Sequence, residues 1–98
     1  MEIEFANQDL DRLETDADFN AGCAPDIVRA YRRRVQSIRA AVDERDLYAV
    51  KGNRFEKLKG NRSHQRSIRL NDQWRLIVEI KQATPKNIIV ILAIEDYH

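Results

Sequence analysis

The stretch "SIRLNDQWRLIVEIK", residues 67–81, decides the fold because apolar side chains recur in it at every second position. This alternation is typical of β-strands with one buried face. It predicts a strand over residues 67–70 and another over residues 74–81, joined tightly at Asn71 and Asp72. Trp74 shares its phase with Leu76 and Val78, so this face is predicted to lie in the core. Arg75 then projects from the opposite face, toward either solvent or a site.

Two further strands are predicted at the two ends of the chain. Residues 2–5 alternate between acidic and apolar side chains, whereas residues 88–94 form a continuous apolar run after a turn at residues 84–87. Such a run is typical of a central strand covered on both faces. If this last strand pairs beside the strand of Arg75, the final residues of the chain emerge near that arginine.

Helices are predicted between the first strand and the hairpin. Asn7 is a suitable N-cap for a helix that carries Leu10 and Leu13, and Pro25 suits the first residue of a second helix. Apolar residues of the second helix recur at spacings of three and four, and its core side comprises Ile27, Val28, Tyr31, Val35, Ile38 and Val42. The arginines of this helix, Arg29, Arg32, Arg33, Arg34 and Arg39, mostly fall on its open side.

The resulting order, β-α-α-β-β-β, predicts an α+β fold over residues 1–98. Two helices pack on one face of a mainly antiparallel sheet. A length of 98 residues with 43% apolar content suits a single domain. The layer between helices and sheet is expected to contain Trp74, Leu76, Val78, Tyr31, Val35 and Ile38.

Composition argues against several classes of protein. The longest apolar run has seven residues, far fewer than the roughly 20 that span a bilayer, and the acidic N-terminus lacks the order of a signal peptide. We therefore expect a cytoplasmic protein without a membrane partner. The single cysteine excludes an intrachain disulfide, and with only two histidines it gives a metal site few ligands. No metal or cofactor is expected, and Cys23 is predicted to be inert.

Charge is distributed unevenly along the chain. Residues 1–18 contain seven acidic residues against Arg12, whereas residues 29–69 contain thirteen Lys or Arg against four acidic residues. The basic block is the electrostatic pattern of a polyanion binder, although a solvated helix face is the alternative. It includes "KGNR" twice, at residues 51–54 and 59–62, which we interpret as a basic loop with turn chemistry.

The last three residues, Asp96, Tyr97 and His98, can orient or exchange protons. RNA cleavage without a metal needs a base for the 2′-hydroxyl, a cation for the phosphate and an acid for the leaving oxygen. His98 can serve as acid or base, Tyr97 can donate a hydrogen bond or stack on a base, and Asp96 can orient either. Arg75 supplies a charged fork for phosphate oxygens, and Lys57 is one of the nearby point charges.

Each of these roles has a structural alternative. Tyr97 and His98 can be solvated, and Arg75 can pair with Glu79 or Glu95. The basic residues of the loop, Lys57, Lys59, Arg62 and Arg66, can be solubilising charges. His64 is readily interpreted as an exposed loop residue.

The segment "FEKLKGNRSHQRSIRLNDQWRLIVEI" together with the ending "IEDYH" resembles the HigB branch of the RelE-type toxins. The resemblance covers nearly the whole chain. It implies a RelE-like microbial RNase fold and a ribosome-dependent, metal-independent mRNA endonuclease that enters the A site and halts translation. It also implies a HigA-type helix-turn-helix antitoxin that binds the toxin and represses their operon, so that operator DNA is reached only through the antitoxin.

The resemblance also assigns residues. The arginine of "QWR" is Arg75, the terminal acid, tyrosine and histidine are Asp96, Tyr97 and His98, and the lysine of "LKG" is Lys59. The expected substrate-binding residues are Lys57, Lys59, Arg62, His64 and Arg69. Some relatives have a histidine three residues before the "LKG" lysine, where this chain has Glu56, so it is open whether Glu56 or His64 joins the site.

Two other functions are compatible with the same fold. A ParE-like toxin of this superfamily poisons DNA gyrase, although the "DYH" ending argues against that branch. A non-catalytic RNA- or ribosome-binding module would use only the basic block and would lose nothing specific on deletion of His98.

Overall fold

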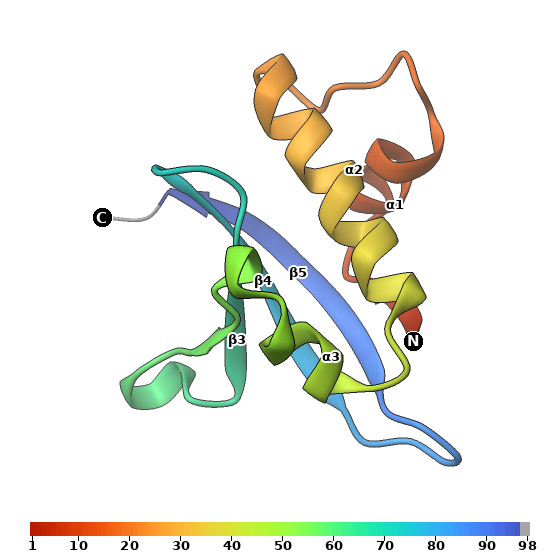
Figure 1. Cartoon of the computed structure of the whole chain (residues 1–98). Coiled ribbons are helices and arrows are strands. Elements are labelled where there is room, and N and C mark those ends of the chain that lie inside the picture. Colours follow the sequence, from red (N-terminus) through yellow and green to blue (C-terminus); the bar gives the residue numbers. More distant parts are fainter. Residues whose placement is uncertain (97–98) are drawn as a thin grey trace.

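A mixed sheet forms the centre of the computed structural model, which describes residues 1–96 (Figure 1). Within these residues the sheet has five strands in the order β1-β5-β4-β3-β2. Only β1 pairs in parallel, with β5, and the other described pairs are antiparallel. The strands are β1 (Glu2–Phe5), β2 (Glu56–Lys57), β3 (Gln65–Arg69), β4 (Trp74–Lys81) and β5 (Ile88–Asp96).

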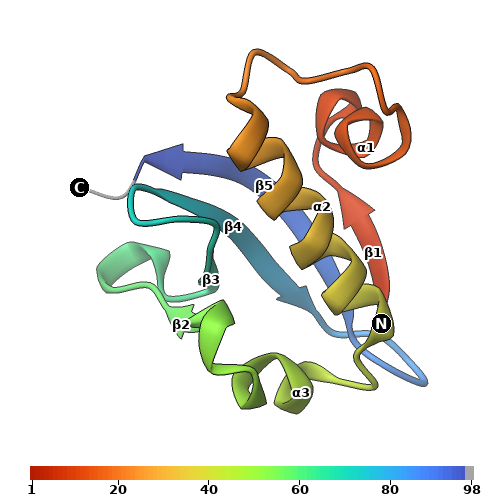
Figure 2. The ribbon, with the colours of Figure 1, turned by 45° about the horizontal axis from the view of Figure 1, so that its top comes forward.

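The two longer helices pack on one face of this sheet (Figures 1 and 2). They are α1 (Gln8–Thr15) and α2 (Pro25–Ala40). The predicted starts of both are confirmed, since the Asn7 Oδ1 atom accepts a hydrogen bond from the Leu10 amide at 2.9 Å and Pro25 is the first residue of α2. The remaining helical segments are α3 (Glu44–Ala49) and two 3₁₀ turns, η1 (Lys51–Asn53) and η2 (Gly60–Arg62).

The core lies between this helical layer and β3, β4 and β5, as the alternation predicts. Leu76 and Val78 are fully buried against α2, and Trp74 packs at the margin of the same cluster. The buried Tyr31 hydroxyl donates a hydrogen bond to the Leu10 carbonyl at 2.6 Å, which fastens α2 to α1. Burial, followed by the charges of Glu14 and Asp11, raises the pKa of Tyr31, so it stays a neutral donor.

Three local predictions were incomplete or wrong between residues 41 and 60. The helix ends at Ala40, so Val42 is not part of its core face and is 59% exposed. Asp43 caps the unpredicted helix α3 by accepting from the Arg45 amide at 2.9 Å. The loop also contributes the two-residue strand β2 to the sheet edge.

The prediction that β5 is covered on both faces was also wrong. Ile89 and Ile91 are fully buried beneath the helices, whereas Val90 and Leu92 on this strand stay partly exposed. The reason is that α1 and α2 cover only one face of the sheet (Figure 2). The face of β3, β4 and β5 that α1 and α2 leave uncovered is named the open face, and Ser67, Arg75 and Ile77 on it are buried beneath other segments.

Several arginines of α2 hold elements together rather than forming a solvated face. Arg32 donates to the Leu13 carbonyl at 3.0 Å and Arg34 to the Arg69 carbonyl at 3.0 Å. Arg39 forms a two-pronged ion pair with Glu14, at 2.6 and 2.7 Å. The acidic N-terminal segment thus neutralises part of the basic block within the fold.

Every helix within residues 1–96 is too short or too polar to span a membrane.

Candidate functional site

A cavity of about 390 Å³ lies on the open face of the sheet, away from α1 and α2. Its lining comes from β3, β4, the end of β5 and the segment between β2 and β3. The lining residues are Leu58, Arg62, Ser67, Arg75, Ile77, Glu95 and Asp96.

Arg75 lies on the β4 side of this cavity and is only 7% exposed. Its position follows from alternation, because its neighbour Leu76 points into the core. In the strand register Arg75 lies between Arg69 of β3 and Glu95 of β5, so these three residues share the open face. A buried guanidinium on this face carries a permanent charge that surrounding water screens poorly.

Arg62 and Glu95 form an ion pair across the cavity. The two guanidinium Nη atoms donate to the two Glu95 carboxylate oxygens at 3.0 and 2.9 Å. The third donor of Arg62, Nε, binds the Gln65 Oε1 atom at 2.9 Å. Glu95, considered from the sequence as a partner for Arg75, therefore has Arg62 as a partner.

Asp96 is the last described residue and lies at the rim of the cavity. It faces Trp74 in the β4–β5 register. Its Oδ2 atom accepts a hydrogen bond from the side-chain Nε2 atom of Gln73 at 3.1 Å. The predicted pairing of β5 beside β4 is thus confirmed, and the described part of β5 ends in the cavity that Arg75 lines. The two other terminal candidates, Tyr97 and His98, lie outside the described residues.

The basic loop contributes to the cavity unequally. In β2, Glu56 pairs with Ser67 and therefore faces the cavity side, whereas Lys57 pairs with Arg66 and faces the other way. Both side chains are exposed. Lys59 is also exposed and precedes η2, so it lies beside the segment that carries Arg62.

Arg69 and His64 lie outside this cavity. Arg69 is opposite Arg75 in the register, but its guanidinium forms an ion pair with Asp72. His64 is exposed and lines a different cavity, of about 340 Å³, together with Ser63, Arg66 and Glu79. That cavity lies farther along β4, so the structure does not bring His64 to Arg75.

Four lining residues were not predicted as site residues: Leu58, Ser67, Ile77 and Glu95. The sequence contained a signal for two of them, since Ile77 has the same phase as Arg75 and Glu95 immediately precedes the terminal triplet. Ser67 and Leu58 become recognisable only through the strand register, which joins β2 to β3 and β3 to β4.

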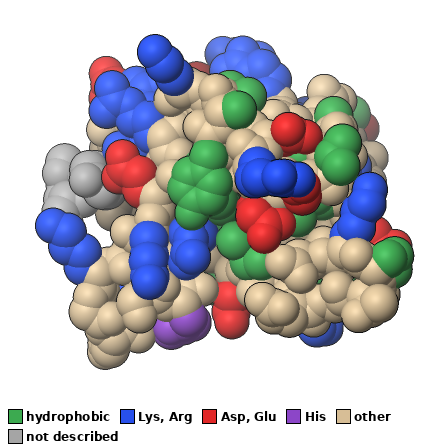
Figure 3. Space-filling model, turned by 60° about the horizontal axis from the view of Figure 1, so that its bottom comes forward, with side chains coloured by type: hydrophobic (Ala, Val, Ile, Leu, Met, Phe, Trp, Pro, Cys, Tyr) green, Lys and Arg blue, Asp and Glu red, His purple; other side chains and the backbone are tan. Residues whose placement is uncertain are grey.

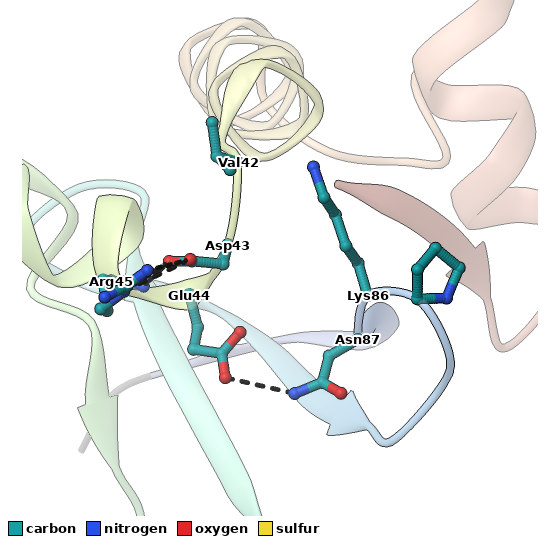
Figure 4. A pocket seen from close by; sticks show the side chains of 7 residues that line it. Val42, Asp43, Glu44, Arg45, Lys86 and Asn87 are labelled. Atoms are coloured by element: carbon teal, nitrogen blue, oxygen red, sulfur yellow. Dashed lines mark hydrogen bonds and ion pairs between the residues drawn. The ribbon is translucent and has the colours of Figure 1, made fainter.

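A third cavity, of about 330 Å³, lies where the α2–α3 linker approaches the β4–β5 connection (Figure 4). Three of its charged side chains form hydrogen bonds or an ion pair with other residues of the lining. Asp43 pairs with Arg45 at 2.7 Å, and Glu44 accepts from the Asn87 amide at 3.2 Å. Hydrogen bonding to the Arg45 side chain, then to its amide, lowers the pKa of Asp43, which fits a helix cap better than an acid–base group.

No cluster of three or more His, Cys, Asp or Glu suited to a metal ion occurs within residues 1–96. Cys23 lines a small apolar cavity with Trp74 and Ile94, and burial raises the pKa of its thiol. A raised pKa lowers the thiolate fraction at neutral pH, in agreement with the predicted inert cysteine.

Two comparisons with known proteins relate this chain to the same family of toxins. Residues 3–98 match the family model described as HigB-like toxin, the RelE-like toxin of type II toxin–antitoxin system HigB. The chain is 37% identical over 79 residues to Toxin HigB-1 of Vibrio cholerae, a stretch that covers 81% of this chain and 83% of that protein.

Solved structures with the same fold are more distant in sequence. A YoeB/ParE toxin from Agrobacterium tumefaciens superposes with a TM-score of 0.59 at 14% identity and covers all of both chains. A YoeB–YefM complex from Staphylococcus aureus gives a TM-score of 0.61 at 22% identity, covering all of this chain and 97% of the other. Both confirm the predicted RelE-like fold.

Proposed function

Because the chain belongs to the HigB-like family of RelE-like toxins of type II toxin–antitoxin systems, we propose that it is a ribosome-dependent mRNA endonuclease. The observation that carries the proposal is the open-face cavity in which buried Arg75 meets the end of β5. RNA cleavage builds negative charge on a phosphate, and a desolvated guanidinium stabilises that charge more strongly than an exposed one.

The proposed reaction is metal-independent and begins with removal of the proton from the 2′-hydroxyl. The 2′-oxygen attacks the adjacent phosphorus, the bond to the 5′-oxygen breaks, and that oxygen takes up a proton. Arg75 is assigned to the phosphate oxygens because its planar fork matches them. His98 is assigned to proton transfer, Tyr97 to the substrate base or phosphate, and Asp96 to orientation of these side chains.

RNA contacts outside the reacting phosphate are assigned to the basic residues around the cavity. Arg62 of η2 lines it directly, Lys59 is exposed just before η2, and Lys57 is exposed on the adjacent strand. Arg69 lies across from Arg75 and would meet the RNA after exchanging its partner Asp72. His64 is farther away, so its assignment is to a flanking nucleotide rather than to the reacting one.

The proposal includes a proteinaceous inhibitor. Membership of a toxin–antitoxin family supports a co-expressed antitoxin, and one solved structure of the same fold is a complex of YoeB with YefM. We assign to this chain a HigA-type helix-turn-helix antitoxin, through which alone it would reach operator DNA. Its ribosomal target places its action in the cytoplasm.

The test is a map of mRNA 5′ ends by primer extension, made with purified protein in the presence and absence of ribosomes. The proposal expects new ends at codon-spaced positions only when ribosomes are translating the message. Cuts of equal strength on free mRNA would contradict ribosome dependence. Absence of cutting together with inhibition of gyrase supercoiling would replace the proposal by the ParE-like activity.

A further inference from the structure

The ion pair between Arg62 and Glu95 places a carboxylate against one of the two guanidinium groups that line the cavity. Arg62 belongs to η2 and Glu95 to β5, 33 residues later in the chain. The carboxylate occupies both Nη donors of the guanidinium, the same two-pronged geometry that a phosphate uses. A resident carboxylate and an RNA phosphate therefore compete for the same donors.

The surroundings of Arg62 keep its guanidinium oriented without Glu95. Its Nε atom is held at 2.9 Å by Gln65, which begins β3. The side chain also extends from η2, whose Gly60 has a φ of 66°, in the left-handed region that favours glycine. Loss of the carboxylate would thus leave two Nη donors directed into the cavity.

The ion pair is accessible enough to exchange. The side chains of Arg62 and Glu95 are 43% and 41% exposed, so water can reach both partners. Exposed ion pairs contribute little to stability, because solvent screens them and two long side chains lose freedom. A phosphate with neighbouring contacts can therefore displace Glu95 at small free-energy cost.

We propose that Glu95 is an internal competitor that occupies the Arg62 fork until an RNA phosphate replaces it. Glu95 thereby lowers the affinity of the free cavity for other anions. This inference rests on the proposed function, because it takes RNA as the ligand that displaces the carboxylate.

The exchange predicts a measurable change in salt dependence. RNA binding releases the counterion condensed on each neutralised phosphate, but a Glu95 carboxylate freed by the exchange attracts a cation from solution and offsets part of that release. A Glu95→Gln variant frees no carboxylate, so binding should steepen the slope of log affinity against log salt by up to about 0.7 for a single-stranded site. Affinity at low salt should also rise, by about two- to fivefold, as expected when a competing exposed ion pair is removed.

The experiment measures binding of fluorescently labelled protein to programmed ribosomes over a series of KCl concentrations. The mRNA carries a 2′-deoxy sugar at the A-site codon, so that binding is not followed by cleavage. Glu4→Gln is the matched control, because Glu4 forms an ion pair of similar exposure with Lys81 at the far end of β4. Circular dichroism verifies that each variant is folded.

A double-mutant cycle with Arg62→Gln isolates the exchange from other effects of Glu95. The proposal expects the steeper slope in Glu95→Gln, no change in Glu4→Gln, and no further effect of Glu95→Gln once Arg62 is replaced. An unchanged slope in folded Glu95→Gln, or weaker binding, would overturn it. Cleavage of normal programmed ribosomes by the wild type is measured in parallel, so failure of the proposed function is recognised separately.

Discussion

Arg75 belongs to the site, whereas the residues on either side of it in the sequence belong to the core. Its neighbours Trp74 and Leu76 point toward the helices, and their burial fixes the strand. Alternation then leaves the Arg75 side chain on the open face, 7% exposed and beside the end of β5. A single residue inserted into this strand would exchange the two faces and remove the arginine from the cavity.

The proposed proton transfer by His98 leads to a prediction for the cleavage rate. Replacement of His98 by Gln should lower the rate of cleavage by about 10² to 10⁴, the usual contribution of a general acid or base. Ribosome binding should stay near that of the wild type, because Arg and Lys make most phosphate contacts. Gln retains the chain length and a hydrogen-bonding side chain.

Single-turnover cleavage and ribosome binding, measured on the same preparation, check this prediction. Cleavage by His98→Gln within a few-fold of the wild type would exclude this histidine as acid or base. Glu56 would then be the next residue to replace, since it faces the cavity side of β2.

At the scale of elements, the two "KGNR" repeats form the same kind of 3₁₀ turn but have different surroundings. Asn53 of the first turn is 1% exposed, and its Oδ1 atom accepts from the Arg34 Nη1 atom at 2.9 Å. Its Nδ2 atom donates to the Leu47 carbonyl at 3.2 Å. This side chain therefore joins α2, α3 and η1, while the corresponding Asn61 is exposed.

Asn53→Ala should lower the free energy of unfolding by about 1–3 kcal/mol, because it leaves a buried carbonyl and a guanidinium donor without their amide partner. Asn61→Ala is the matched control and should change stability by no more than about 0.5 kcal/mol. Urea unfolding of both variants measures the difference. Equal stabilities would show that the first repeat is not a structural connection.

The sequence predicted the elements that carry long patterns. The period of two over residues 67–81 and the apolar spacing of α2 extend far enough to identify a hairpin and a helix. Helix α3, with six residues, and strand β2, with two, are too short for a period to be recognised. The formation of α3 depends on a local hydrogen bond at its cap, Asp43, and the formation of β2 depends on tertiary pairing with β3.

The contacts within the site were also predictable only where a long sequence pattern determined them. The face of Arg75 and the approach of β5 followed from alternation and from strand pairing. The contact between Arg62 and Glu95 did not, because it depends on how η2 folds over the open face, and charge alone made Arg62 equally suitable for solvent. His64 was grouped with the site by its place in the loop, yet the turn at η2 carries it to another cavity.

The charges of the acidic N-terminal segment and of the basic block are partly neutralised by ion pairs within the fold. Glu14 of the acidic segment pairs with Arg39 of the basic block, whereas Asp16 pairs with Arg12 within the acidic segment itself. In Figure 3, Lys and Arg side chains lie on the side of the molecule where the described chain ends, and others lie along the top and right of the same face.

Replacement of Lys57 and Lys59 together by Ala should weaken ribosome binding and reduce its salt slope, since each neutralised phosphate releases counterion. The codons that are cut should not change, because phosphate contacts carry no sequence information. Lys81→Ala with Lys86→Ala is the matched control at the distant β4–β5 connection. A slope that is lowered equally by both pairs would indicate a general charge effect without a defined RNA path.

The central claim is that the cavity around Arg75 is the active site of a ribosome-dependent nuclease, and single-turnover cleavage by Arg75→Lys tests it most directly. Lysine keeps the charge but loses the planar fork. We expect the cleavage rate on programmed ribosomes to fall by about 10²-fold or more, the magnitude typical of a lost transition-state contact, while circular dichroism and ribosome binding remain those of the wild type. A folded Arg75→Lys protein that cuts mRNA at the wild-type rate would contradict the claim.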